Sequence, residues 1–250
     1  MTARLPLSAV LITLNCAGSL RATLESLRFC DEILAVDSGS TDGTLAILGE
    51  FGVKTLHEPW RGFGPQKQFA IEQAAHDWVL CVDSDEIVSA ELRAGIEAAL
   101  EKPEFQFYEF PRCNRFLGRY LKHGEGYPDL SLRLFDRRHA RWSDDLVHEK
   151  VITLGLVGRI KGDLLHHSED NIESYLAKQN RYTTLAAKAL IDEGAPAPMA
   201  KVLFSPIFRF IKFYFLRAGF LDGLPGLIHI LIGCFNSFAK YAKMIEFSRR

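Results

Sequence analysis

The chain has 250 residues, of which 48% are hydrophobic and 24% are charged, and its formal net charge at pH 7 is -1. This length and hydrophobic content allow a substantial core and exclude a disordered chain. The balanced charge argues against a nucleic-acid-binding protein, for which a strongly basic domain is expected.

Charge is distributed unevenly along the chain. Residues 199–250 hold eight lysines and arginines against two acids, Asp222 and Glu246, so the preceding residues are net acidic. A basic tail rich in aromatic residues indicates contact with a membrane surface or with a partner.

The cysteines and the amino-terminal stretch indicate a compartment. The five cysteines are widely spaced and include no C-x-x-C pair, which argues against a zinc site and a disulfide framework. Thiols used in this way fit a reducing cytoplasm. Residues 5–14 are apolar but short and are followed by Asn15, so they resemble a first strand rather than a signal peptide.

Apolar runs and helical patterns alternate over the first hundred residues. In chain order they predict a strand at 7–14, a helix carrying Leu20, Leu24 and Leu27, a strand at 33–36, a helix at 44–51, a strand at 53–57, a helix at 66–75, a strand at 78–82 and a helix at 89–100. This alternation predicts a parallel, doubly wound sheet.

The pattern changes after Pro103. Short β-like segments follow at 105–110, 130–135, 151–154 and 157–160, and they predict a mixed half of the sheet that closes over the first half. A helix is expected at 172–190 and a linker at 194–198. We therefore divide the chain into a domain at 1–198 and a basic amphipathic helical tail at 199–250.

The tail has two apolar helical segments, 202–220 and 224–247. Neither is a clean membrane span, because Lys and Arg interrupt the first, and the second has only 224–239 before Lys240, fewer than the roughly 20 residues that a span requires. Amphipathic helices at the bilayer interface fit this pattern. A helical pair that packs on the sheet or on another subunit of a homo-oligomer fits it as well.

Acidic side chains follow the fourth strand directly, in the order Asp83, Ser84, Asp85 and Glu86. Ligands of open α/β sheets collect at the carboxyl ends of strands, and two carboxylates there can hold a divalent cation. The alternative is that Ser89 caps the next helix and the acids, including Glu86, support its first turn.

A polar loop also follows the second strand, with the sequence DSGSTDGT at 37–44. Glycine, serine and aspartate there form a tight turn that brings backbone N–H groups and side-chain oxygens close to a ligand.

These pieces occur in an order that resembles one family. Thr13-Leu14-Asn15, the loop at 36–44 and Val82-Asp83-Ser84-Asp85-Glu86 together resemble the family 2 glycosyltransferases, over residues 7–167. Arg133-Leu134-Phe135, Val147-His148-Glu149 and the basic tail make the chain most similar to the small lipopolysaccharide-core sugar transferases. The resemblance implies an α/β, GT-A (Rossmann-like) mixed sheet flanked by helices, with a C-terminal helical extension.

The resemblance also implies the roles of the donor-site residues. Thr13 and Asn15 would line the nucleoside pocket, and Asp37 would accept a hydrogen bond from the base, usually uracil. Asp37 could instead only build its turn. Lys67 matches a position that faces the nucleotide, although it could equally be a solvated lysine at a helix start.

The acids of the D-x-D pattern would hold the ribose and the metal. Asp83 would lie near the ribose, with Ser84 beside it, and Asp85 would bind Mg²⁺ or Mn²⁺, which stabilises the departing diphosphate. Asp83 is a second metal candidate. Arg133 would pair with the diphosphate or, alternatively, form an edge-strand salt bridge.

The general base is less well defined, because the Glu-Asp pair that many family members use is missing. Glu149 is the leading candidate, and Asp129 and Asp145 are the alternatives. His166 or His167 could complete a metal shell or be structural. The chain also has Cys16-Ala17-Gly18 where the resembling subgroup usually has acids.

The prediction is therefore a metal-dependent inverting glycosyltransferase, of the hexosyltransferase type. It would move a sugar from a nucleotide donor, expected to be a UDP-sugar, to a lipid-linked or lipopolysaccharide-core acceptor on the cytoplasmic face of a membrane. A sugar-phosphate nucleotidyltransferase would need a Gly-rich loop with an Arg directly after the first strand, and residues 15–20 lack one. A non-catalytic glycan- or membrane-binding module is the third reading, and the intact acids at Asp83 and Asp85 argue against it.

Overall fold

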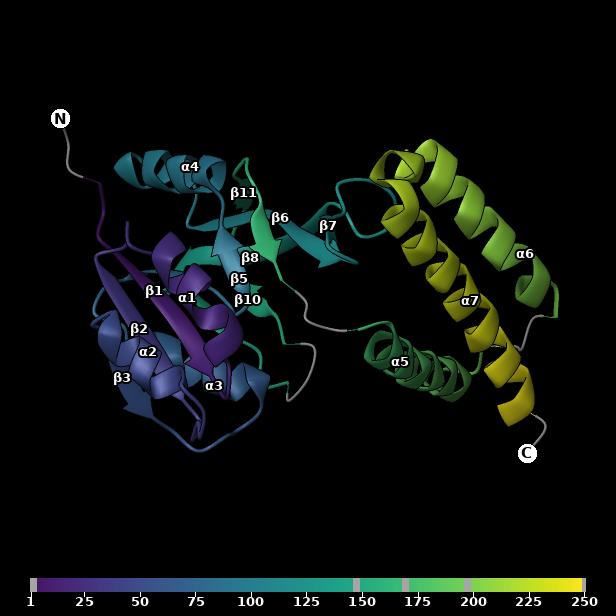
Figure 1. Cartoon of the computed structure of the whole chain (residues 1–250), viewed down its shortest axis with the longest axis horizontal. Helices are drawn as coiled ribbons and strands as arrows, with labels where there is room; N and C mark the ends of the chain where they lie inside the picture. The colour runs from purple at the N-terminus through teal and green to yellow at the C-terminus, as the bar shows by residue number, and fades with distance from the viewer. Residues whose placement is uncertain (1–3, 146–148, 168–170, 196–198, 249–250) are drawn as a thin grey trace. The chain divides into compact units, whose positions relative to one another are not determined.

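The computed structural model describes residues 4–145, 149–167, 171–195 and 199–248. These residues form two compact units. The first comprises Met1–Arg112 and Asp129–His167, and the second comprises Cys113–Pro128 and Ser168–Arg250. Figure 1 labels the helices and strands of both.

A mixed sheet forms the centre of the first unit, in the strand order β3-β2-β1-β4-β8-β6-β12-β5. Its parallel part consists of β1 (Leu7–Thr13), β2 (Glu32–Asp37), β3 (Lys54–His57) and β4 (Trp78–Cys81). The remaining strands on this path are β5 (Glu86–Val88), β6 (Phe107–Phe116), β8 (Asp129–Asp136) and β12 (Leu164–His166). Strand β8 is antiparallel to β4 and β6, so the parallel part of the sheet ends at β4, the strand that Asp83 and Asp85 follow.

Three short strands complete this unit. Strand β11 (Val157–Arg159) pairs with β6, and β9 (Ala140–Trp142) and β10 (Val151–Thr153) form a separate two-stranded sheet.

Side chains of β1 point alternately to the two faces of the sheet, and helices cover a hydrophobic core on each face. Leu7, Ala9 and Leu11 pack in the core that includes buried residues of α1 (Ala17–Ser26), α2 (Thr44–Glu50) and α4 (Ala90–Glu101). Val10 packs in the other core, with α3 (Phe63–Glu72).

The start of α4 follows the predicted pattern. Ser89 caps it by accepting a hydrogen bond from the backbone N–H of Leu92, and Leu92, Ile96 and Leu100 are fully buried.

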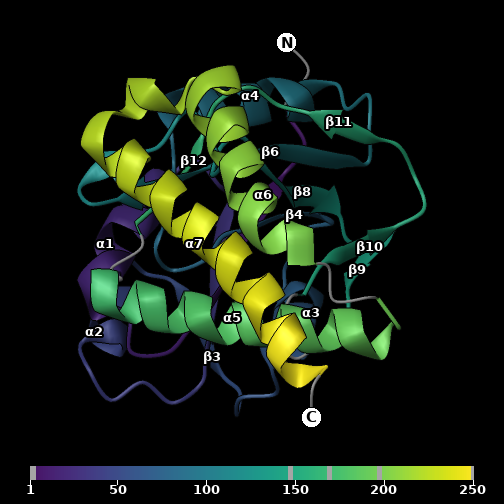
Figure 2. The same ribbon diagram turned by 90° about the vertical axis from the view of Figure 1, so that its right-hand side faces the viewer.

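Helices dominate the second unit. They are α5 (Ile172–Asp192), α6 (Met199–Phe210), the π-helical turn η1 (Ile211–Leu216), the 3₁₀ turn η2 (Gly219–Asp222) and α7 (Gly223–Phe247). Helix α7 packs against both α5 and α6, as Figure 2 shows. The end of β6 and β7 (Arg119–Tyr120) form a hairpin in the same unit.

Polar contacts tie the loop after this hairpin to the helices. The His123 backbone N–H and ring Nδ1 lie 2.8 and 3.0 Å from the buried Asp222 carboxylate, and Glu125 pairs with Arg209. Residues 113–128 therefore pack with the helices of the tail.

The predicted fold class is confirmed: a mixed sheet is flanked by helices and followed by a C-terminal helical extension. The domain boundary at 198 stays a prediction, and residues 196–198 lie outside the described range. Helix α3 was expected at 66–75 but begins at Phe63, because Gly62 takes a positive φ of 98° and Pro65 fits the first helical turn.

Candidate active site

Three strands bring their carboxyl ends to one edge of the sheet. Thr13 at the end of β1 lies opposite Asp37 at the end of β2 in the parallel register. On the other side of β1, the backbone N–H of Val82 donates to the carbonyl of Val10, which brings the residues after β4 to the same edge. The chain order reverses around β1, and such switch points are where open α/β sheets bind ligands.

Asp37 is the centre of the turn after β2. Its Oδ1 accepts hydrogen bonds from the backbone N–H groups of Gly39 and Ser40 at 2.9 and 2.8 Å. Its Oδ2 accepts from Thr13 Oγ1 at 2.9 Å and from Ser40 Oγ at 2.5 Å. Burial raises the pKa of Asp37, but these hydrogen bonds, led by those from Ser40, outweigh burial and keep the pKa below its usual range.

These four hydrogen bonds fill the acceptor sites of the Asp37 carboxylate. The turn-building role that the sequence left open is thus present in the structure. Recognition of a base by Asp37 stays a prediction, and it would require one of the four donors to give way.

Asn15 fixes the other side of the same loop. It takes a left-handed φ of 49°, and its Oδ1 accepts a hydrogen bond from the backbone N–H of Thr41 at 2.8 Å. The fully buried Gln66 of α3 donates through Nε2 to Ser38 Oγ and to the carbonyl of Glu58, each at 3.1 Å. The loop is therefore held from both β1 and α3.

Asp83 lies between two buried cations. Lys67 Nζ lies 2.9 Å from Asp83 Oδ1, and Arg133 Nη2 lies 2.9 Å from Asp83 Oδ2. Burial raises the pKa of Asp83, but the charges of Arg133 and Lys67 outweigh burial and hold the pKa far below its usual range. For Arg133, burial lowers the pKa, and Asp83 and Glu86 more than compensate, so the pKa is raised. Asp83 and Arg133 are therefore both charged near neutral pH.

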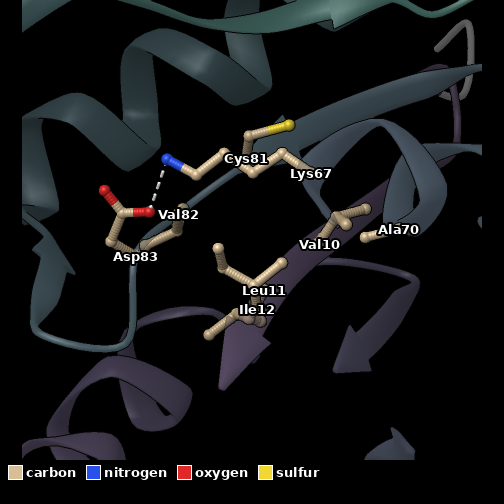
Figure 3. Close-up of a pocket in the computed structure, with 8 residues that line it drawn as sticks. All are labelled: Val10, Leu11, Ile12, Lys67, Ala70, Cys81, Val82 and Asp83. Carbon is tan, nitrogen blue, oxygen red and sulfur yellow. Dashed lines mark ion pairs between the residues drawn. The ribbon is translucent and has the colours of Figure 1, made fainter. Parts of the chain in front are cut away.

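Figure 3 shows Lys67 and Asp83 at the polar end of a small pocket between β1, β4 and α3. Cys81 lines the same pocket, and burial raises the pKa of its thiol to about 11. The thiol is therefore uncharged at neutral pH, and the cluster of Lys67 and Asp83 has an apolar wall beside it.

Glu149 joins this cluster through Lys67. Its Oε1 lies 2.7 Å from Lys67 Nζ, so a single ammonium bridges Glu149 and Asp83. The neighbouring Val147 and His148 lie outside the described residues. Of the three candidate bases, Glu149 is the one that shares a partner with Asp83.

The two alternative bases have other contacts. Asp129 is half-exposed and lies 3.8 Å from Arg112 Nη1, while the backbone carbonyl of Asp145 accepts a hydrogen bond from Gly64 N–H.

Asp85 points to a different partner. Its Oδ2 lies 3.1 Å from His166 Nε2, and its backbone carbonyl accepts from the His167 N–H at 2.9 Å. Antiparallel pairing of β12 with β5 brings His166 opposite Glu86 and hence beside the D-x-D segment. The carbonyl of Ser84 accepts from Thr23 Oγ1 at 3.0 Å.

The donor set for a cation is small. Within the described ranges, no group of three or more His, Cys, Asp or Glu side chains is arranged to hold a metal ion. Mg²⁺ is commonly bound by one or two carboxylates together with substrate phosphates and water. Asp85 with His166 beside it fits that mode, in which the substrate supplies further oxygens.

Glu86, Arg112 and Trp142 complete the cluster, although the sequence patterns did not assign them to it. Glu86 is fully buried: its Oε1 lies 2.7 Å from Arg112 Nε and 3.4 Å from Arg133 Nη2, and its Oε2 accepts from the Asp83 N–H. The Trp142 ring centre lies 4.9 Å from Lys67 Nζ and 5.7 Å from Arg133 Cζ. Of the alternative reading of this segment, the Ser89 cap is confirmed, but Glu86 does not support the next helix, because it begins β5.

A family model and a relative that is similar over nearly the whole chain identify the family. The family model described as glycosyl transferase family 2 matches residues 8–157. The chain is 33% identical over 254 residues to the lipopolysaccharide core biosynthesis glycosyltransferase LpsC of Rhizobium meliloti, covering 98% of this chain and 94% of the relative. It is 28% identical to an uncharacterized glycosyltransferase of Rickettsia typhi, covering 97% and 87%. The crystal structure of S. aureus TarS 1-349 in complex with UDP has the same fold, with a TM-score of 0.50, 14% identity and coverage of 98% and 91%.

Proposed function

Because the chain belongs to glycosyl transferase family 2, we propose that it transfers a sugar from a UDP-sugar to an acceptor of the lipopolysaccharide core. The glycosyltransferase prediction is confirmed, and family membership favours it over the nucleotidyltransferase and the non-catalytic binding module. The observation that carries the proposal is the salt-bridged cluster of Lys67, Asp83 and Arg133 at the switch point of the sheet.

The donor end of this proposal rests on charge. A departing nucleoside diphosphate gains negative charge as the bond from the sugar anomeric carbon to the phosphate oxygen breaks. Lys67 and Arg133 provide two buried positive charges at this edge, and Trp142 lies against both. Thr13, Asn15, Asp37 and Ser84 supply the nucleoside side of the pocket in the proposal, and the UDP in the TarS crystal structure agrees with this choice of donor.

Asp85 is the proposed metal ligand, with His166 beside it. Bound Mg²⁺ or Mn²⁺ would act there as a Lewis acid on the diphosphate oxygens. Both Asp83 oxygens already face cations, so in our proposal Asp83 orients Lys67 and Arg133, and its direct metal contact stays a prediction.

Glu149 is the proposed general base. In an inverting transfer, the acceptor hydroxyl attacks the anomeric carbon from the face opposite the diphosphate, and its proton passes to the base. The ammonium of Lys67 contacts the same carboxylate that would take this proton. When the donor is bound, the Lys67 ammonium would contact the diphosphate instead of Glu149, which would leave the Glu149 carboxylate available as the base.

The acceptor is inferred from the relative. LpsC is described as a lipopolysaccharide core biosynthesis glycosyltransferase and is similar over nearly the whole chain, tail included. A lipid-linked acceptor requires the enzyme to work at a membrane, and the basic tail is the part that would contact it, from the cytoplasmic side.

The first experiment tests the donor site. Calorimetric titration with UDP in the presence and absence of Mn²⁺ should show tighter binding with the metal. Asp85→Asn should remove this metal dependence and abolish turnover. The matched control is Asp77→Asn, an acid at the opposite end of β4 that pairs with Arg138 on the surface. Metal-independent UDP binding by the wild type would contradict the proposal.

The second experiment tests the base. Glu149→Gln should bind UDP with nearly wild-type affinity but lose transfer by about 100-fold or more, as expected for a lost general base. Glu109→Gln, which removes a surface pair with Arg159, serves as the control. Full transfer by Glu149→Gln would move the role to Asp129 or Asp145.

A further inference from the structure

Helix α6 and the turn after it expose an apolar stripe. Leu203, Phe204, Ile207 and Phe208 are 54–69% exposed, and Ile211 and Phe215 extend the stripe at 44% and 57%. Their spacing of three or four residues puts them along one side of the helix. Large apolar side chains gathered in this way mark an interaction surface rather than ordinary scatter.

Helix α7 adds a second exposed stripe, and a groove lies between the two helices. Its exposed members are Leu224, Leu231, Phe235 and Phe238. The groove is lined by Ala200, Lys201, Phe204, Ser205 and Phe208 of α6 and by Tyr241 of α7. We call the two stripes and the groove the α6–α7 face.

Lysines of α6, η1 and α7 lie beside the exposed stripes, each against an aromatic ring of the same helical unit. Lys201 and Lys240 have Nζ atoms 5.8 and 4.5 Å from the ring centre of Tyr241, and Lys212 Nζ lies 5.2 Å from that of Phe213. Among the described residues of 199–248, the acids are Asp222, which is buried against His123, and Glu246 near the end of α7. The face is therefore apolar with a positive rim, which is complementary to anionic lipid headgroups.

The contacts on the opposite side of α7 argue against a membrane-spanning helix. Residues 219–247 are long and apolar enough to cross a bilayer by length and composition alone. However, polar side chains between residues 229 and 243 of α7 bind α5: His229 contacts Tyr175 Oη, Asn236 Nδ2 donates to Gln179 Oε1, and Lys243 Nζ donates to Asn180 Oδ1. A spanning α7 would draw the exposed charges of α5 into hydrocarbon, at a high cost.

We propose that the α6–α7 face lies in the plane of an anionic membrane leaflet, with its apolar side chains inserted and its lysines at the level of the lipid phosphates. This inference rests on the proposed function for its lipid-linked acceptor and specifies how the tail meets the membrane. A second copy of the chain is a poorer occupant, because two such faces would oppose lysine to lysine with few acids to pair them.

Liposome co-sedimentation of the full-length protein tests the surface. Binding should be strong to phosphatidylcholine vesicles that contain phosphatidylglycerol and weak to phosphatidylcholine alone. The double variant Phe204→Glu/Phe208→Glu should lower the partition coefficient by about ten-fold or more. Lys201→Glu/Lys212→Glu should remove the preference for anionic lipid. Leu185→Glu, which changes a 51% exposed apolar residue of α5, should bind like the wild type.

Depth measurements separate the in-plane arrangement from a membrane span. Leu224→Trp and Phe238→Trp place reporters 14 residues, or about 21 Å, apart on α7. With lipids brominated at different acyl positions, the in-plane arrangement predicts equal depths for the two reporters, after subtraction of the wild-type signal. Depths that differ by most of this separation would overturn the proposal.

Two outcomes keep this inference distinct from the proposed function. The vesicles contain neither donor nor acceptor, so their binding does not depend on transfer, and the face variants should keep wild-type UDP affinity, which also shows that they are folded. Unchanged vesicle binding by both double variants would overturn the membrane surface. So would lipid-free dimerisation, measured by sedimentation velocity, that Phe204→Glu/Phe208→Glu abolishes.

Discussion

Glu86 is more deeply buried than Asp83, the acid of the D-x-D pattern that belongs to the same cluster. It is fully buried, contacts Arg112 and Arg133, and accepts the backbone N–H of Asp83. A buried carboxylate with three partners is tolerated only because each partner compensates its lost hydration. Glu86 therefore positions Asp83 and Arg133 without itself being placed to touch substrate.

Glu86→Gln should destabilise the protein by about 3 kcal/mol or more, because it leaves Arg112 and Arg133 short of one buried countercharge. Denaturant unfolding monitored by circular dichroism measures this effect, and UDP titration should show weaker binding in the fraction that is folded. Glu109→Gln, which removes a carboxylate that pairs with Arg159, should lose less than about 1 kcal/mol. Equal stability of the two variants would contradict the positioning role.

Asp37→Asn should destabilise the protein by about 2 to 3 kcal/mol at neutral pH, since an amide cannot accept the four hydrogen bonds that the carboxylate accepts. The lowered pKa of Asp37 fixes the pH dependence. Its stabilising contribution is fully present above the ordinary pKa of about 3.9 and is lost as the pH falls through the folded pKa.

The difference in unfolding free energy between wild type and Asp37→Asn should therefore be largest at neutral pH and shrink below pH about 4. The unfolding free energy of the surface variant Asp77→Asn should differ only slightly from that of the wild type at neutral pH. A difference for Asp37→Asn that grows on acidification would refute the assignment.

At the residue scale, the sequence predicted most of the acids and cations of the site but not their partners. Lys67, Asp83, Arg133 and Glu149, taken from the family resemblance, do converge. Trp142 was missed because a single aromatic residue in a short strand carries no pattern. The contact of Glu149 with Lys67 spans 82 positions of sequence, and no local rule predicts it.

At the element scale, α3 docks closely on the segment that follows β9. A Cβ atom on Gly64 would lie 2.0 Å from the carbonyl oxygen of Ser143, and the Gly64 N–H already donates to the carbonyl of Asp145. Lys67 lies one turn further along the same helix. The absence of a side chain at Gly64 thus lets α3 approach the segment that leads to Glu149.

Gly64→Ala should destabilise the protein by about 1 to 3 kcal/mol through steric conflict with this backbone. It should also weaken UDP binding, because Lys67 moves with the helix. Gly49→Ala in α2 is the matched control: its Cβ would have no neighbour within 4 Å, so it should be neutral or stabilising by up to about 1 kcal/mol. Thermal unfolding of both variants checks the contrast.

The elements of the first hundred residues were predictable because periodicity and capping act locally. Ser89 with Leu92, Ile96 and Leu100 is such a case. The insertion of β8 between β4 and β6 was not predictable in detail, because it depends on pairing between distant segments. The tail was expected to break only near Asp222, but the structure shows a π-helical turn at 211–216 as well.

At the scale of the whole molecule, acid should weaken the helical unit through His229. This ring is partly buried beside Phe116, and its Nε2 lies 3.1 Å from Tyr175 Oη. Burial first, and the nearby charge of Arg209 second, lower the pKa of His229 below its ordinary value of about 6.5, and Asp222 only partly opposes them.

The neutral ring of His229 stabilises the fold above pH about 6.5, and this contribution is lost as the pH falls from there through the folded pKa. The melting temperature of His229→Gln should therefore fall less than that of the wild type between about pH 7 and about pH 5, a range that brackets the ordinary pKa of histidine. His139→Gln, in an exposed turn of the first unit, should follow the wild-type slope. Parallel slopes for wild type and His229→Gln would contradict the prediction.

The path of the chain between the units has a consequence for synthesis and for evolution. The chain leaves the first unit after Arg112, contributes residues 113–128 to the helical unit and returns at Asp129 to form β8, which pairs with β4 and β6. During translation this excursion emerges well before the helices on which it packs. Replacement of the C-terminal helices alone would remove the packing partners of residues 113–128. We therefore expect the helices and residues 113–128 to be inherited together.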